Sequence, residues 1–205
     1  QTREMDGVFP NFSSLRSYRS VTKFIEQINT PDRVVATMRR AFAALKMGRP
    51  GPAMVEVPFD VAMEDVDDSL IESYKPVRAT RAQADPQDVL DAARALLDAK
   101  NPVIQAGQGV LYADACQELL ELAELLQAPV MTTLAGKSAF PEKHPLALGS
   151  GSGVVSGTAY QFLKDADLVF GIGTSFSKHG LTTTIPPGKV LIHATNDPID
   201  IGKNY

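Results

Sequence analysis

The sequence predicts an α/β fold, in which short buried strands form a mostly parallel sheet that is covered by helices on both faces. Three observations lead to this prediction. From residue 85 onward, segments with apolar residues at helical spacing alternate with short, mainly apolar runs. Such runs are typical of parallel strands that are buried on both faces. Several of these strands are followed by glycine-containing turns.

Composition limits the classes of protein that this chain can represent. Of its 205 residues, 44% are hydrophobic and 21% are charged, which is ordinary for a soluble globular protein. The net charge of -4 is spread along the chain without a basic block, so we expect neither nucleic-acid nor membrane partners. No apolar run approaches the roughly 20 residues that span a bilayer.

The chain ends and the cysteine content suggest a piece of a cytoplasmic protein. The polar start, Gln1-Thr2-Arg3-Glu4, has no signal-peptide pattern and no initiator methionine, so we expect a cut within a longer chain. The single cysteine, Cys116, excludes an intrachain disulfide and is compatible with a reducing compartment.

The first part of the chain predicts one helix and one strand after an irregular segment, residues 1 to about 30. Thr30 is expected to cap the helix, with Pro31 at its first position and Gly48 closing it in a left-handed conformation. Residues 53–57 form a short apolar run that suits a buried strand. The apolar face of the helix comprises Val34, Val35, Met38, Ala41, Phe42 and Leu45.

Residues 64–84 are acidic at first and then polar, which indicates a linker over the surface. We therefore divide the chain into residues 1–66, which belong to one α/β domain, a linker at 67–84, and a second α/β domain at 85–205.

In the second domain, Asp85 is expected to cap a helix that has Pro86 at its first position. Asp114 is expected to open the next helix, and a third helix lies near residues 158–164. A long loop precedes that third helix and ends at Gly157. The buried stripe of the first helix is expected to be Val89, Leu90, Ala93, Leu96 and Leu97. Strands are predicted at 103–106, 129–134, 168–171 and 189–194.

Glycines at the strand ends are the candidate binding residues. Gly107 and Gly109 follow one predicted strand, and Gly171 and Gly173, with Thr174, end another. Ligands of open parallel sheets bind beyond the carboxyl ends of the strands, where glycine lets the backbone approach a phosphate and exposed N–H groups favour anions. The alternative is that these glycines only make tight turns. Two such turns in one domain favour a nucleotide-type site.

Other nucleotide and metal motifs fail on spacing. A dinucleotide-binding fingerprint after Gly107 and Gly109 would need a third glycine where Tyr112 stands. Gly136-Lys137-Ser138 resembles the end of a phosphate-binding loop, but the leading glycine is replaced by Met131. The histidines lack partners at metal-ligand spacing, so we expect no metal site at His144, His179 or His193.

Gly48-Arg49-Pro50-Gly51-Pro52 and several later strings occur in an order that resembles the thiamine-diphosphate-dependent enzymes, which include acetolactate synthase, benzoylformate decarboxylase and pyruvate oxidase. Gly48-Arg49-Pro50-Gly51-Pro52, followed by residues 55–61, is similar to the end of that family's pyrimidine-binding domain. Four further segments are similar to that family's middle domain, namely residues 101–109, 129–137, 165–174 and 192–204.

The resemblance implies a three-layer, Rossmann-like middle domain at 85–205, preceded by the end of a pyrimidine-binding domain at 1–66. It implies a parent enzyme that is a homodimer or homotetramer and uses thiamine diphosphate and Mg²⁺ to decarboxylate or join 2-oxo acids. The family's activating glutamate would lie before Gln1, and its Gly-Asp-Gly…Asn metal motif would follow Tyr205. We therefore expect no catalytic or metal-binding residue in this chain, and no activity without the remaining domains.

In such a middle domain the resemblance allows FAD or ADP at a crevice formed by Gly107, Gly109, Gly171, Gly173 and Thr174. FAD-binding members usually carry an Arg-Phe-Asp-Asp-Arg-like run after the middle domain's Gly-x-Gly, whereas this chain reads Thr-Ser-Phe-Ser-Lys-His at 174–179. Two alternatives remain open. One is a free-standing nucleotide-binding module without catalysis, and the other is an interaction domain whose residues 1–66 pack only with a partner.

Overall fold

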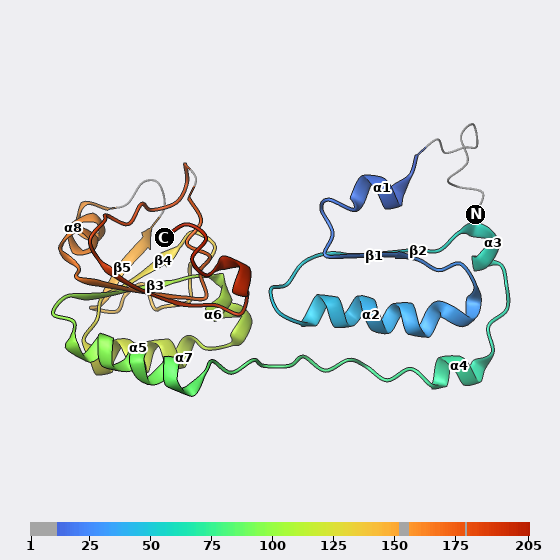
Figure 1. Ribbon diagram of the computed structural model, residues 1–205, viewed down its shortest axis with the longest axis horizontal. Coiled ribbons are helices and arrows are strands. Elements are labelled where there is room, and N and C mark those ends of the chain that lie inside the picture. The colour runs from blue at the N-terminus through green and yellow to red at the C-terminus, as the bar shows by residue number, and fades with distance from the viewer. Residues whose placement is uncertain (1–11, 152–155, 179) are drawn as a thin grey trace. The chain divides into compact units, whose positions relative to one another are not determined.

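The structure is a computed structural model that describes residues 12–151, 156–178 and 180–205. The chain divides into two compact units, Gln1–Ala82 and Gln83–Tyr205 (Figure 1). Each unit has its own sheet, so we describe them separately.

The first unit is built around a pair of parallel strands, β1 (Phe24–Gln27) and β2 (Ala53–Glu56), whose register runs from Phe24 opposite Ala53 to Gln27 opposite Glu56. Helix α2 (Val34–Lys46) covers one face of the pair, and the short helix α1 (Ser14–Tyr18) lies on the other face (Figure 1). The strand predicted at 53–57 is therefore confirmed. Of the segment expected to be irregular up to about residue 30, residues 1–11 lie outside the described residues. For the rest the expectation is wrong, because α1 forms there and β1 gains a partner from β2, far along the chain.

The ends of α2 agree in part with the prediction. Thr30 takes the N-cap position of a 3₁₀ turn (Pro31–Arg33) that leads into α2, but its side chain makes no capping hydrogen bond. Gly48 has a φ of 59°, which confirms the left-handed conformation after the helix. Of the predicted apolar face, Val35 and Ala41 are buried, whereas Leu45 at the helix end is exposed.

The remaining helices of the first unit are short. Helix α3 (Phe59–Ala62) follows β2, and α4 (Asp68–Glu72) begins where the Asp67 carboxylate accepts the N–H of Ser69 at 2.8 Å. The segment predicted to be a surface linker, 67–84, contains this one α-helix, which begins there because Asp67 satisfies an N–H group of its first turn.

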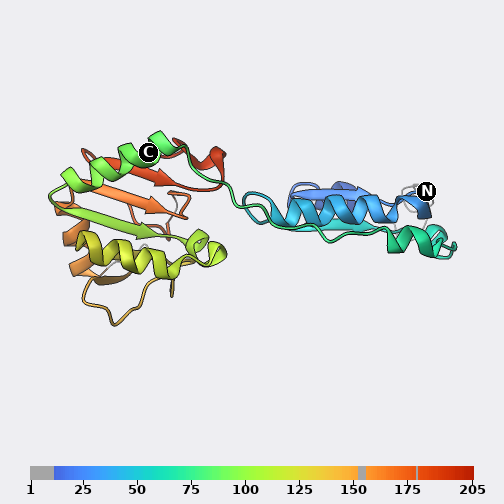
Figure 2. The ribbon, with the colours of Figure 1, turned by 90° about the horizontal axis from the view of Figure 1, so that it is seen from below.

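The second unit is a five-stranded sheet in the order β5-β4-β3-β6-β7, with every neighbouring pair parallel. The strands are β3 (Pro102–Ala106), β4 (Val130–Thr133), β5 (Ala147–Gly151), β6 (Leu168–Ile172) and β7 (Val190–Ala194). Helices α5 (Pro86–Asp98), α6 (Gln108–Ala113) and α7 (Cys116–Leu126) lie on one side, and α8 (Gly157–Asp165) lies on the other (Figures 1 and 2). This arrangement confirms the predicted three-layer α/β fold.

Two elements of this unit were not predicted. Strand β5, with the sequence Ala-Leu-Gly-Ser-Gly, lacks a strand pattern and forms because β4 offers it a partner across a register shift at Val130 and Met131. Helix α6 fills the turn after β3, so Asp114 is not the start of a helix. Asp114 instead ends α6 in a left-handed conformation, with a φ of 55°, and α7 begins at Cys116.

The core of this unit lies on both faces of the sheet. Leu96, Leu119 and Ala123 pack on the face covered by α5 and α7, and Leu163 of α8 packs on the other. The predicted buried stripe of α5 is wrong except for Leu96, because the helix meets the sheet through Leu96 and the neighbouring alanines, Ala95 and Ala99. The rest of that stripe is exposed, namely Val89, Leu90, Ala93 and Leu97.

The connections give the sheet a topological switch point between β3 and β6. From β3 the chain proceeds to β4 and β5 on one side, and it then returns through α8 to place β6 on the other side of β3. In open α/β sheets, the carboxyl ends of the two strands at such a point are the usual place of a ligand crevice.

Candidate functional site

The structure brings most of the predicted binding residues together at this switch point. Gly107 and Gly109 follow β3, and Gly173 and Thr174 follow the adjacent strand β6. Gly171 lies inside β6, where it is paired with Gln105 of β3. Chain distance alone could not predict this adjacency, because the two turns are more than 60 residues apart.

The N–H groups of these glycines are already used by the backbone. Gly107 donates to the carbonyl of Ile172, and Gly109 donates to the carbonyl of Gly173, both at 2.8 Å. Gly173 in turn donates to the carbonyl of Ala194 at 2.8 Å. These three N–H groups are therefore not available to a bound anion, and a direct role for the glycines in nucleotide binding stays a prediction.

The same glycines are required for close packing of the two turns. A Cβ atom on Gly107 would lie 2.6 Å from Cα of Thr174, and one on Gly109 would lie 2.6 Å from Cα of Gly173. Gly173 has a φ of 61°, and its Cβ would lie 2.6 Å from the nitrogen of Val110. Any side chain at these positions would push the turns apart.

Gly136, which follows β4, extends this contact to a third strand end. Its Cβ would lie 2.6 Å from the carbonyl oxygen of Ala106 and 2.8 Å from the carbonyl carbon of Gly107. We refer to Gly107, Gly109, Gly136 and Gly173 as the glycine cluster. The sequence singled out Gly136 only within a phosphate-loop motif that fails on spacing. The residues around a turn glycine do not show which distant backbone packs against it.

Gly171 has a different role, because an aromatic ring takes the place of its missing side chain. The ring of Phe176 lies directly against the position that a Cβ of Gly171 would occupy. Phe176 is 6% exposed and has a φ of 45°, which is unusual for a bulky residue. Its ring packs on His193 with a centroid distance of 4.7 Å and on Tyr205 with one of 5.8 Å.

Polar contacts fix the turn that follows Gly173. The Nε2 atom of His193 lies 2.7 Å from the carbonyl oxygen of Thr174 and donates to it. The hydroxyl of Thr174 accepts the N–H of Phe176 at 3.3 Å, so this side chain faces its own turn. His193 therefore holds the turn after β6 through a bond to its backbone.

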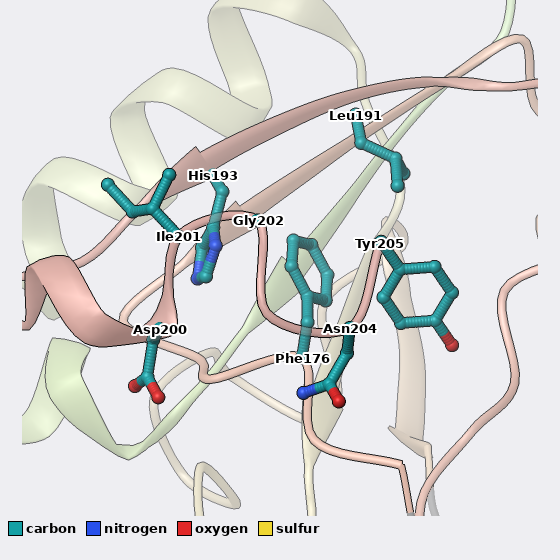
Figure 3. Close-up of a pocket in the computed structure, with 8 residues that line it drawn as sticks. All are labelled: Phe176, Leu191, His193, Asp200, Ile201, Gly202, Asn204 and Tyr205. Carbon is teal, nitrogen blue, oxygen red and sulfur yellow. The ribbon is translucent and has the colours of Figure 1, made fainter.

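A pocket of about 200 Å³ lies beside this aromatic group (Figure 3). Its lining combines apolar rings with a carboxylate and an amide, and the ring of Phe176 lies in view between His193 and Tyr205. The lining residues are Phe176, Leu191, His193, Asp200, Ile201, Gly202, Asn204 and Tyr205.

Gln105 is a residue of this region that the strand pattern did not single out. Its side chain is 6% exposed, and Oε1 has no hydrogen-bond partner among the residues that the structure describes. The signal that could have identified it is a lone amide within the apolar run Val103–Ala106.

Among the described residues, His144 and the possible metal-binding groups form no second site. His144 accepts the N–H of Leu146 through Nδ1 and contacts a carboxylate oxygen of Glu124 through Nε2, both at 3.2 Å, which is a structural arrangement. His179 lies outside the described residues. Within the described ranges, no three side chains among histidine, cysteine, aspartate and glutamate are grouped to hold a metal ion, and no helix has the length and apolarity to cross a membrane.

Comparison with known proteins gives consistent relatives. Residues 89–205 match the family model described as the thiamine pyrophosphate enzyme, central domain. The chain is 36% identical to the probable acetolactate synthase large subunit of Methanocaldococcus jannaschii, over 96% of this chain and 34% of that protein. It is 32% identical to the glyoxylate carboligase of Escherichia coli O157:H7, over 90% of this chain and 32% of that protein.

A third relative is the acetolactate synthase large subunit of Corynebacterium glutamicum, which is 34% identical over 89% of this chain and 30% of that protein. The chain thus spans about a third of the length of the curated relatives that it matches.

Proposed function

The chain belongs to the family of thiamine pyrophosphate enzymes, and from this premise we propose that it is part of a carboligase or decarboxylase that acts on a 2-oxo acid. The support is that its relatives are named acetolactate synthase and glyoxylate carboligase. Residues 85–205 act as the middle domain, residues 1–66 as the end of the pyrimidine-binding domain, and residues 67–84 as the linker. The parent enzyme is a cytoplasmic homodimer or homotetramer.

Thiamine diphosphate and Mg²⁺ supply the chemistry when the parent binds them. The residues that hold thiamine diphosphate and its metal, and those that act in catalysis, are expected in the other domains of the parent rather than in this chain. Its contribution is architectural, and it depends on domains outside residues 1–205.

The middle domain additionally holds a nucleotide, FAD or ADP, beside Gly107, Gly109, Gly171, Gly173 and Thr174. The observation that carries this proposal is the topological switch point between β3 and β6, whose carboxyl ends bear these residues. Since three of the glycine N–H groups are bonded within the protein, the glycines shape the crevice and other groups must supply its polar contacts.

The test uses the complete protein, purified and assayed for release of CO₂ from pyruvate and from glyoxylate with Mg²⁺ and thiamine diphosphate. Activity that requires both additions is the expected result. A protein that turns over neither substrate, and shows no thermal shift with Mg²⁺ and thiamine diphosphate, contradicts the proposal. Separate additions of FAD, ADP and NAD⁺ test the crevice, because a ligand at 100 times its dissociation constant adds about 2.7 kcal/mol of stability.

The second candidate is a nucleotide-binding module without catalysis. It is favoured by the second unit, which has a complete sheet and core of its own. A thermal shift with FAD or ADP, in a complete protein that responds neither to thiamine diphosphate nor to 2-oxo acids, distinguishes this candidate from the first.

A further inference from the structure

Gln105 carries a buried amide oxygen that has no hydrogen-bond partner among the described residues. It is the fourth residue of β3, two positions before Gly107, and therefore lies near the carboxyl end of the central strand. Only 6% of the residue is exposed, and its Oε1 atom accepts no hydrogen bond from any described residue.

The neighbouring strands explain why no partner reaches this amide. In the register, Gln105 lies between Met131 of β4 and Gly171 of β6. Met131 is fully buried and has no side-chain donor. The place beside Gly171 is filled by the ring of Phe176, which has no donor either.

The next residue in this row across the sheet is His193 of β7, whose side chain is already hydrogen-bonded to another group. His193 is paired with Gly171, and its Nε2 atom donates to the carbonyl of Thr174. The row Met131–Gln105–Gly171–His193 thus offers the amide oxygen no donor from the sheet. A buried carbonyl oxygen without a donor destabilises a fold, and an apolar side chain of equal size would suit this row better.

We propose that Gln105 is a nucleotide-contacting residue, whose amide oxygen accepts a hydrogen bond from an N–H or O–H group of the nucleotide. This inference rests on the proposed crevice at the carboxyl ends of β3 and β6. Because the N–H groups of Gly107, Gly109 and Gly173 are bonded within the protein, the side-chain amide two positions before Gly107 supplies polar recognition that these N–H groups cannot. FAD and ADP both offer ribose hydroxyls and an amino group as donors.

The experiment measures ADP and FAD binding by titration calorimetry on the complete protein and on Gln105→Met. Methionine keeps the length and shape of the side chain but removes the amide. The ligand-free Tm is expected to stay level or rise, while the affinity for the nucleotide falls about tenfold, the usual effect of one net hydrogen bond. Gln105→Leu is the second variant, in case methionine disturbs folding, and Gln117→Met on the exposed face of α7 is the control.

The outcomes separate this inference from the proposed function. If the unchanged protein binds neither ADP nor FAD, the crevice itself is refuted, and the role of Gln105 falls with it. If the unchanged protein binds one of them and Gln105→Met binds it with equal affinity, the crevice stands and only the role of Gln105 is overturned. A tenfold loss that Gln117→Met does not share supports the inference.

Discussion

Asn101 and Asp167 hold the starts of two neighbouring strands together through a reciprocal pair of hydrogen bonds. The N–H of Asn101 donates to a carboxylate oxygen of Asp167 at 2.9 Å, and the N–H of Asp167 donates to the carbonyl of Asn101 at 3.3 Å. The carboxylate also accepts the N–H of Lys100 at 2.7 Å. This contact joins β3 and β6 at their N-terminal ends, whereas the candidate site lies at their carboxyl ends.

The Asp167 contact predicts a specific loss of acid stability. The N–H groups of Lys100 and Asn101 lower the pKa of Asp167 below its ordinary value of 3.8. Because the folded-state pKa is below the unfolded value, the carboxylate stabilises the fold above about pH 3.8, and this contribution is lost as pH falls through the folded-state pKa. Asp167→Asn should lower the Tm at pH 7. The difference in Tm between this variant and the unchanged protein should become smaller below pH 3.8.

The control for that measurement is Asp98→Asn, which changes an exposed carboxylate at the end of α5. Thermal melts between pH 3 and pH 7 should show no comparable narrowing for this variant. Equal pH profiles for the two variants would show that the hydrogen bonds to Lys100 and Asn101 do not stabilise the fold.

The first unit should show a similar dependence through Glu26. Its carboxylate, on β1, pairs with the guanidinium of Arg40 on α2 and accepts the hydroxyl of Thr37 at 3.1 Å. The hydrogen bond from Arg40 lowers the pKa of Glu26 below 4.5, so its stabilising effect is present above that pH and is lost on acidification. Arg40→Met should therefore reduce the acid sensitivity of the first unit, as monitored by NMR signals of β1 and β2 across pH 3 to 7, whereas Arg39→Met should not.

The glycine cluster predicts a large difference between two glycine substitutions. Gly173→Ala should destabilise the second unit by about 1–3 kcal/mol, because a Cβ would overlap Val110 in a left-handed backbone. Gly157→Ala is the matched control: apart from its chain neighbours and its own helix backbone, no atom of the described residues lies within 4 Å of its Cβ, and alanine is the better helix former. Urea denaturation checks both, and a Gly173→Ala variant as stable as Gly157→Ala would refute the close packing of the turns.

The ring of Phe176 should contribute more to the free energy of unfolding than is usual for a loop residue. Phe176→Ala should cost about 3–5 kcal/mol, because the ring is buried over Gly171 and packs on His193. Phe162→Ala, which removes a ring that is 45% exposed on α8, should cost clearly less. Denaturant unfolding measures both, and equal costs would mean that Phe176 does not anchor the turn after β6.

Much of the local structure followed from the sequence because its causes are local. Asp85 caps α5 by accepting the N–H of Gln87 at 2.8 Å, as the Asp-Pro start predicted, and β2 lies where the apolar run indicated. Strands β1 and β5 escaped prediction because each is stabilised by a partner strand rather than by its own composition. The stripe on α5 was visible as a pattern, but the pattern cannot tell whether Leu96 or Leu97 faces the sheet.

The sequence by itself determined the α/β class, the Asp85 cap of α5, and the two glycine turns as candidate binding residues, since each depends on neighbours a few positions apart. Only the tertiary structure placed Gly107 beside Gly173, because strand order is decided by packing across the whole sheet. It also showed that the N–H groups of Gly107, Gly109 and Gly173 bond within the protein, whereas the Gln105 amide oxygen has no partner among the described residues. Hydrogen-bond partners that come from distant strands are set by three-dimensional contact, and no spacing along the chain encodes them directly.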